Sequence, residues 1–139
     1  MLKITILQIG KTKNYFLKNL IDEYHKRLGS FAQLFILIKK NEDVLWTSTP
    51  KDAFIVLLDD SGKQYSSKEF ANMIEVKKNQ GISHLVFLIG PADGFLKAEK
   101  FDLKLSLSPM TFSHQTIRLI LAEQLYRVFC ILENKPFPK

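Results

Sequence analysis

Three short segments of this sequence place glycine or proline beside polar side chains, directly after an apolar run. They are residues 58–62 (Leu-Asp-Asp-Ser-Gly), 90–94 (Gly-Pro-Ala-Asp-Gly) and 107–112 (Leu-Ser-Pro-Met-Thr-Phe). Open α/β sheets bind ligands at the loops that follow the carboxyl ends of their strands, and glycine lets the backbone approach a ligand closely. Together the segments indicate a small-molecule site, although each one taken alone is equally typical of a plain turn.

The charged side chains in and near these segments each have two interpretations. Asp59, Asp60 and Asp93 lie beside glycine-containing turns, where aspartate usually accepts hydrogen bonds from its own backbone. A carboxylate at a ligand loop can instead accept a hydrogen bond from a ribose hydroxyl. Arg118, shortly after the third segment, is a candidate for contact with a phosphate, and His114 beside that segment is a second candidate for a functional role.

Several other chemistries lack the residues that they require. The sequence contains no Gly-x-Gly-x-x-Gly dinucleotide fingerprint, no phosphate-binding lysine loop and no Gly-x-Ser-x-Gly nucleophile elbow. His25, His84 and His114 lie far apart in sequence and no Cys-x-x-Cys pair accompanies them, so we expect no metal site. His84 opens an apolar run and is interpreted as a structural residue.

The apolar residues follow two alternating periodicities, which is typical of strands that alternate with helices. We expect strands at residues 3–9, 33–39, 53–58, 84–89 and 103–107, and helices at 15–28, 66–79 and 114–133. Residues 40–52 are expected to form a loop or a scrap of helix, and a short helical segment is expected after residue 94. This order predicts one α/β domain over residues 1–139, with a mostly parallel sheet flanked by helices.

The last predicted helix carries more apolar surface than a lone peripheral helix needs. One stripe of the helix is widened by further apolar residues, the whole set being Ile117, Leu119, Leu121, Ala122, Leu125, Val128, Phe129 and Leu132. Such a surface favours a partner helix or a subunit interface.

Composition points to a soluble protein with a polyanionic partner. Twenty Lys and Arg against fourteen Asp and Glu give a net charge of +6, and the basic residues are spread from Lys3 to Lys139. Because phosphate contacts release counterions, this balance suits a broad docking surface for nucleic acid. The single cysteine, Cys130, is expected to be a buried core residue. No apolar run approaches the roughly 18 residues that are needed to span a membrane, and no segment resembles a signal peptide. We therefore expect a cytoplasmic protein that does not associate with a membrane.

The last third of the chain resembles a known family. The sequence from Leu105 to Gln115 (Leu-Ser-Leu-Ser-Pro-Met-Thr-Phe-Ser-His-Gln), followed by Arg118 and by residues 121–127 (Leu-Ala-Glu-Gln-Leu-Tyr-Arg), is similar to the ribosomal RNA large subunit methyltransferase H family of the SPOUT superfamily. The resemblance continues in order through most of the chain, at residues 3–10, 23–28, 58–63, 66–67 and 87–94.

This resemblance implies an enzyme that uses S-adenosylmethionine to methylate N3 of a pseudouridine in 23S rRNA of the assembled ribosome. It also implies a homodimer and a C-terminal trefoil knot. The resemblance assigns cofactor binding to three loops, at Leu58, Gly90, Leu107, Ser108, Pro109, Met110, Thr111 and Phe112. It assigns no catalytic base, and it leaves Arg118 and His114 as candidates for positioning the RNA.

The sequence departs from the family pattern in three places. Members commonly end in a Tyr-His pair, where this chain has Phe137-Pro138; Pro91 replaces a second glycine; and residues 40–52 are shorter than usual. The first departure keeps two other functions open: a catalytically weakened ribosome-binding assembly factor, and a methyltransferase of another RNA such as tRNA. The scattered charge also leaves room for a small-molecule binding protein without an RNA partner.

Overall fold

A computed structural model describes residues 1–97 and 100–137 of the chain. Five strands form one sheet in the order β2-β1-β4-β3-β5, and each neighbouring pair is parallel. In chain order the elements are β1 (Lys3–Ile9), α1 (Tyr15–Leu28), β2 (Gln33–Lys39), α2 (Glu42–Thr47), β3 (Phe54–Gln64), α3 (Ser67–Asn79), β4 (His84–Ile89), β5 (Leu103–Ser106) and α4 (His114–Leu132). The α/β fold with a parallel sheet flanked by helices is confirmed.

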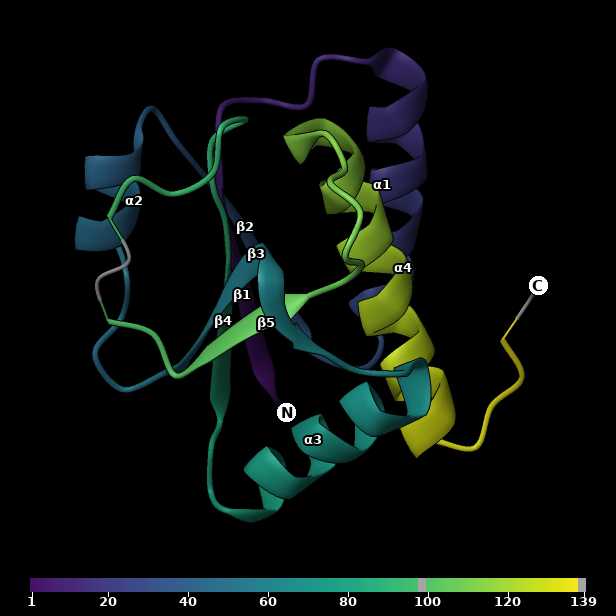
Figure 1. Ribbon diagram of the computed structural model, residues 1–139. Helices are drawn as coiled ribbons and strands as arrows, with labels where there is room; N and C mark the ends of the chain where they lie inside the picture. The colour runs from purple at the N-terminus through teal and green to yellow at the C-terminus, as the bar shows by residue number, and fades with distance from the viewer. Residues whose placement is uncertain (98–99, 138–139) are drawn as a thin grey trace.

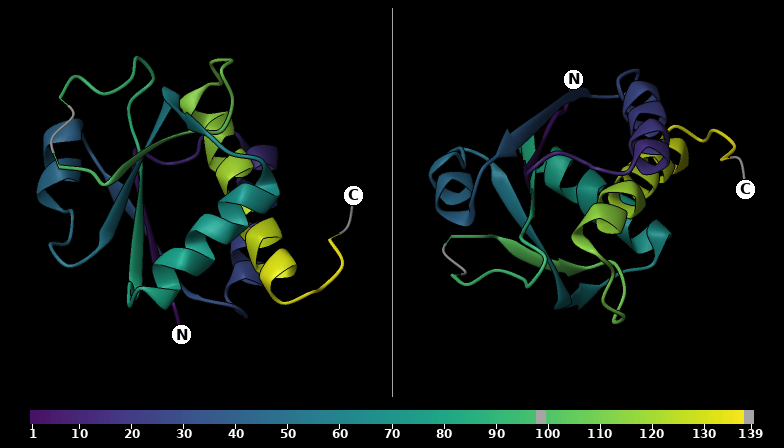
Figure 2. Two further views of the ribbon diagram at one scale, coloured as in Figure 1. Left: turned by 60° about the horizontal axis from the view of Figure 1, so that its bottom comes forward. Right: turned by 90° about the horizontal axis from the view of Figure 1, so that it is seen from above.

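The helices lie on both faces of the sheet. Helices α1, α3 and α4 cover one face and the short α2 lies on the other, as the views in Figures 1 and 2 show. Strand β4, near the centre of the sheet, contributes to the apolar clusters on both faces because its successive side chains point to opposite faces. Leu85, Phe87 and Ile89 pack in the cluster under the three long helices, whereas Val86 and Leu88 pack with the α2 side. A strand buried on both faces explains the continuous apolar run at this point of the sequence.

Local sequence signals set most of the helix boundaries. Ser66 and Glu69 form a capping box, with Ser66 Oγ accepting from the Glu69 amide at 3.0 Å and Glu69 Oε1 accepting from the Ser66 amide at 2.8 Å. Ser113 caps α4 by accepting from the Thr116 amide at 3.1 Å. Both helices therefore begin where the sequence predicts.

Strand β3 is longer than predicted. The sequence suggests that it ends at Leu58 and that residues 59–62 turn the chain, but the strand runs on to Gln64. Its pairing with β5 shifts register between Leu58 and Lys63, so the residues between them bulge out and pairing then resumes. Gly62 allows β3 to pair with β5 again after the bulge, since a Cβ at this position would lie 2.6 Å from the Lys104 carbonyl oxygen.

Two smaller expectations had different outcomes. Of the two alternatives expected for residues 40–52, the structure has the short helix, α2, which Asn41 caps by accepting from the Val44 amide at 2.9 Å. The helical segment expected after residue 94 does not appear in residues 95–97 and 100–102; residues 98–99 lie outside the described part.

The apolar stripe of α4 packs against other elements of the same chain. Leu121, Leu125 and Val128 are fully buried in the cluster shared with α1, α3 and the sheet, and Cys130 is buried as predicted. Helices α1 and α3 are thus partner helices for the stripe, one of the two outcomes expected for it, while Leu119 lies outside this cluster and is half-buried. The C-terminal trefoil knot implied by the resemblance stays a prediction.

Candidate active site

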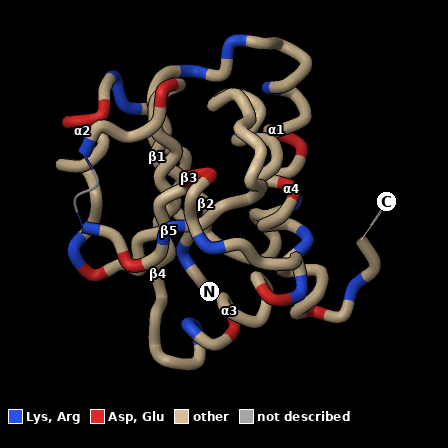
Figure 3. The backbone as a smooth tube through the Cα atoms, viewed as in Figure 1, with Lys and Arg blue, Asp and Glu red and all other residues tan. Residues whose placement is uncertain are grey.

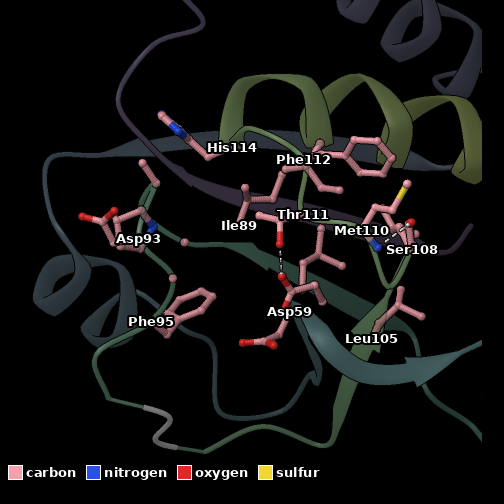
Figure 4. A pocket seen from close by; sticks show the side chains of 18 residues that line it. Asp59, Ile89, Asp93, Phe95, Leu105, Ser108, Met110, Thr111, Phe112 and His114 are labelled. Atoms are coloured by element: carbon pink, nitrogen blue, oxygen red, sulfur yellow. Dashed lines mark hydrogen bonds between the residues drawn. The ribbon is translucent and has the colours of Figure 1, made fainter.

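The three segments singled out in the sequence meet at one cavity of about 350 Å³. It lies at the carboxyl edge of the sheet, between the bulge of β3 and the loops that follow β4 and β5. Figure 4 shows Asp93 and Phe95 of the loop after β4, Thr111 of the loop after β5 and His114 at the start of α4 surrounding it. Of the positions predicted to bind a cofactor, those that line the cavity are Leu58, Gly90, Leu107, Ser108, Met110, Thr111 and Phe112. Pro109 is not among the lining residues.

Hydrogen bonds fix the third loop and connect it to the first. The Ser106 hydroxyl donates to the Ser108 carbonyl at 2.7 Å, and Ser108 Oγ accepts from the Met110 amide at 3.0 Å. The Thr111 hydroxyl then donates to the Asp60 carboxylate on the segment after Leu58. Segments 51 residues apart in sequence are thereby joined across the mouth of the cavity.

Asp59 has the turn role that its setting suggests. Its Oδ1 accepts from the Ser61 hydroxyl at 2.6 Å and from the Ser61 amide at 2.8 Å. These two hydrogen bonds lower the pKa of Asp59, so its carboxylate stays charged at neutral pH. The bulge after Leu58 therefore presents fixed negative charge on one side of the cavity.

Phe95 closes the cavity wall formed by the second loop. A Cβ on Gly90 would lie 2.7 Å from the Phe95 ring, so only glycine lets the ring pack against the backbone here. The ring also packs on the Trp46 indole of α2, with 5.6 Å between the ring centroids. The second loop is thus supported from the α2 side of the sheet.

Glu42, at the first turn of α2, holds the backbone that follows Phe95. Its two carboxylate oxygens accept from the Leu96 amide at 2.9 Å and from the Lys97 amide at 2.8 Å. Burial alone would raise the pKa of Glu42, but these two hydrogen bonds and one from the Trp46 indole at 3.3 Å outweigh it and lower the pKa. Sequence reasoning missed this contact because its partners lie 54 and 55 residues away and form no local motif.

His114 and Arg118 lie in different surroundings. His114 lines the cavity at the start of α4. Partial burial and the positive charges of Arg118 and Lys13 lower its pKa below the ordinary value of 6.5, so its imidazole is neutral at pH 7. Its Nε2 lies 3.3 Å from Gln115 Nε2 and accepts from that side-chain amide, so Nδ1 of the neutral ring carries the hydrogen that a ligand at the cavity can accept.

Arg118 does not form the exposed phosphate contact expected from the sequence. It is only 2% exposed, and its guanidinium donates to the Ile9 carbonyl at 2.6 Å and to the Thr12 hydroxyl at 3.0 Å. This side chain joins α4 to the segment after β1. Its burial lowers its pKa, but an arginine remains protonated at neutral pH.

Other candidate residues lie away from the cavity. His84 Nε2 is 2.8 Å from the Thr5 hydroxyl at the opposite edge of the sheet, in agreement with its structural interpretation. Phe137 packs near the end of α4, with its ring 3.7 Å from the Arg127 guanidinium carbon. Arg127 and His114 are about 20 Å apart along the helix axis. Pro138 lies outside the described residues.

Residues 1–97 and 100–137 contain no cluster of three or more His, Cys, Asp or Glu side chains arranged to hold a metal ion. Across the same residues, none of the helices combines the length and the apolar character that crossing a bilayer requires.

Comparison with known sequences gives consistent matches over nearly the whole chain. Residues 2–137 match the family described as "Predicted SPOUT methyltransferase". The Ribosomal RNA large subunit methyltransferase H of Flavobacterium psychrophilum is 41% identical over 155 residues, covering 98% of both chains. Its namesake from Carboxydothermus hydrogenoformans is 36% identical over 159 residues, covering 99% of this chain and 100% of the relative.

A third relative bears on the short segment at residues 40–52. The protein of the same name from Protochlamydia amoebophila is 40% identical over 140 residues, and the alignment covers all of both chains. The relatives therefore include a chain of nearly this length.

Glu42→Ala is expected to loosen the second loop. Without the carboxylate, the Leu96 and Lys97 amides should exchange with solvent at least about tenfold faster, since a hydrogen bond to a charged group contributes roughly 1.5–3 kcal/mol. Emission from Trp46, the single tryptophan, should shift to longer wavelength as its contact with Phe95 loosens. Asp43→Ala, which removes the exposed neighbouring carboxylate, is the control. Unchanged amide exchange in Glu42→Ala would show that the contact does not hold the loop.

Proposed function

This chain belongs to the SPOUT methyltransferase family, and from that premise we propose that it methylates N3 of a pseudouridine in 23S rRNA of the assembled ribosome. The methyl donor is S-adenosylmethionine, and the protein works in the cytoplasm. The observation that supports this most strongly is the convergence of the three cofactor loops implied by the resemblance on one cavity.

The lining of the cavity fits a ligand with apolar, polar and cationic parts. Its volume of about 350 Å³ lies within the usual range for small-molecule sites. Leu58, Leu107 and Phe112 offer apolar surface to the adenine, and the Ser108 and Thr111 hydroxyls lie among them. The nearby carboxylates of Asp59, Asp60 and Asp93 suit the positive charges of the cofactor and its ribose hydroxyls. We assign no role to Pro109 beyond shaping the loop.

The protein's part in the reaction is to bind the methyl donor and the target nucleotide and to orient them relative to each other. S-adenosylmethionine supplies a methyl group on a sulfonium that is already a strong donor, so catalysis rests on holding N3 in line with that methyl. The N3 proton must leave to water or to a nearby base, and the Nδ1–H of neutral His114 at the cavity can donate a hydrogen bond to the nucleotide. His114 is therefore proposed as an RNA-positioning residue.

One observation favours a second candidate function. Phe137 stands where the family commonly has the Tyr of its terminal pair, and here the ring packs on Arg127 and on Tyr126, whose ring centroid is 5.6 Å away. A chain without the usual terminal imidazole could bind ribosomes as an assembly factor with weak transfer, or act on another RNA. Both alternatives keep the same fold and cofactor site.

The proposed enzyme is a homodimer, as the resemblance implies. Apolar side chains on the outer face of α1 are exposed, with Tyr15 at 70%, Phe16 at 77% and Leu20 at 53%. A group of exposed large apolar residues on one helix is characteristic of a protein–protein contact. We propose that this surface contributes to the dimer.

Sedimentation equilibrium tests the dimer. The protein should sediment at micromolar concentration with twice its chain mass of 16.1 kDa. Phe16→Asp with Leu20→Asp should give a folded monomer, because burying two carboxylates in an apolar contact is unfavourable. Lys18→Ala on the same helix is the control. A monomeric wild-type protein would refute the dimer.

Methyl transfer tests the function. Labelled methyl from S-adenosylmethionine should enter ribosomes that lack this modification, and mapping should place it on one pseudouridine of 23S rRNA. Gly90→Leu should reduce transfer at least about tenfold, because its side chain would displace the Phe95 ring and fill the cavity. Gly29→Ala, at the end of α1, is the control.

The outcomes separate the candidates. Label in tRNA but not in ribosomes would assign another RNA substrate. Ribosome binding with measurable cofactor binding but no transfer would favour the assembly factor.

A further inference from the structure

The segment between β1 and α1 lies beside the start of α4, where His114 lines the cavity. Gly10 has a φ of 72°, which turns the chain away from the sheet, and its amide donates to the Lys39 carbonyl at 2.9 Å. Residues 11–14 then cross the carboxyl edge of the sheet toward α1 and pass near the start of α4 (Figure 1). Two lysines, Lys11 and Lys13, lie on this segment.

The first turns of α4 hold this segment in place. Gln115 Oε1 accepts from the Lys13 amide at 2.9 Å, and Gln115 Nε2 donates to the Lys11 carbonyl at 3.4 Å. Arg118 adds its hydrogen bonds to the Ile9 carbonyl and the Thr12 hydroxyl. The contacts tie the segment to the same helix turn that carries His114. The backbone of both lysines therefore has a set position relative to His114.

The buried Arg118 places a positive charge next to this segment. Its guanidinium is hydrogen-bonded to neutral groups, and within residues 1–97 and 100–137 its buried Nε has no hydrogen-bond partner. A buried cation whose hydrogen bonds go to neutral groups favours an anion close by. The backbone amides at the start of α4 add to the positive potential at the same place.

The two lysines are available for an external partner. Both are exposed, and the ion pairs found in the described part of the chain, Lys18–Asp22 and Arg27–Glu23, do not use them. The ammonium of Lys13 is near enough to His114 to lower the pKa of that imidazole. Figure 3 shows basic residues along the connection from β1 to α1.

From these contacts we infer that residues 10–14 form a phosphate-binding surface for the RNA strand whose base enters the cavity. Lys11 and Lys13 contact the phosphates, and Gln115 and Arg118 are positioning residues that hold the lysines in register with His114. This inference rests on the proposed function, because it takes RNA as the substrate. Contacts of this kind fix the position of the strand and carry no sequence information themselves.

Removing the two lysines tests the surface. Lys11→Ala with Lys13→Ala should weaken binding to 70S ribosomes lacking the modification at least about tenfold, and should reduce the slope of log affinity against log salt by about two. Binding of S-adenosylmethionine and the urea unfolding midpoint should not change. Gln115→Ala keeps both charges but frees the segment, so it should weaken binding by a smaller factor.

A matched double variant controls for the loss of charge alone. Lys51→Ala with Lys78→Ala removes the same charge from the opposite edge of the sheet, since Lys51 precedes β3 and Lys78 lies at the end of α3 before β4. It should keep the wild-type salt slope. Equal affinities and slopes for the two double variants would overturn the inference while leaving the proposed function intact. Failure of the wild-type protein to bind ribosomes or accept the cofactor would instead overturn the proposed function.

Discussion

The parallel pairing of β3 with β5 is the constraint on which the cavity depends. It brings the bulge of β3 together with the carboxyl ends of β4 and β5, although β4 and α3 separate β3 from β5 in sequence. The pairing continues past a bulge only because Gly62 lets two backbones approach closely. A side chain at that position would push β3 away from Lys104 and separate the first loop from the third.

Once the strand ends are together, a small number of hydrogen bonds shapes the site. Asp60 and Thr111 join the first loop to the third, and Glu42 anchors the second loop from the other face of the sheet. Arg118 and Gln115 bring the β1–α1 connection to the same edge. The cavity is therefore bounded by fixed backbone on several sides, which suits a reaction whose main requirement is alignment of donor and acceptor.

Sequence patterns predicted the parts of the fold that local chemistry determines. The strands at 3–9, 33–39 and 84–89, and the capped starts of α3 and α4, agree with the structure. Features set by distant contacts were not predictable: β3 continues because it meets β5, and Glu42 contacts Lys97 across 55 residues. Arg118 looked like an exposed helix residue because its partner Ile9 is 109 residues away. Strand-end loops did indicate where the cavity forms, because parallel strands share one carboxyl edge.

The central claim is that the three loops together bind S-adenosylmethionine. Amide NMR spectra recorded while the cofactor is added test it residue by residue. The account predicts shifts concentrated in residues 58–60, 90–95 and 107–112, with β2 and the end of α4 unaffected. Shifts confined to other surfaces, or no shifts at millimolar cofactor, would contradict it.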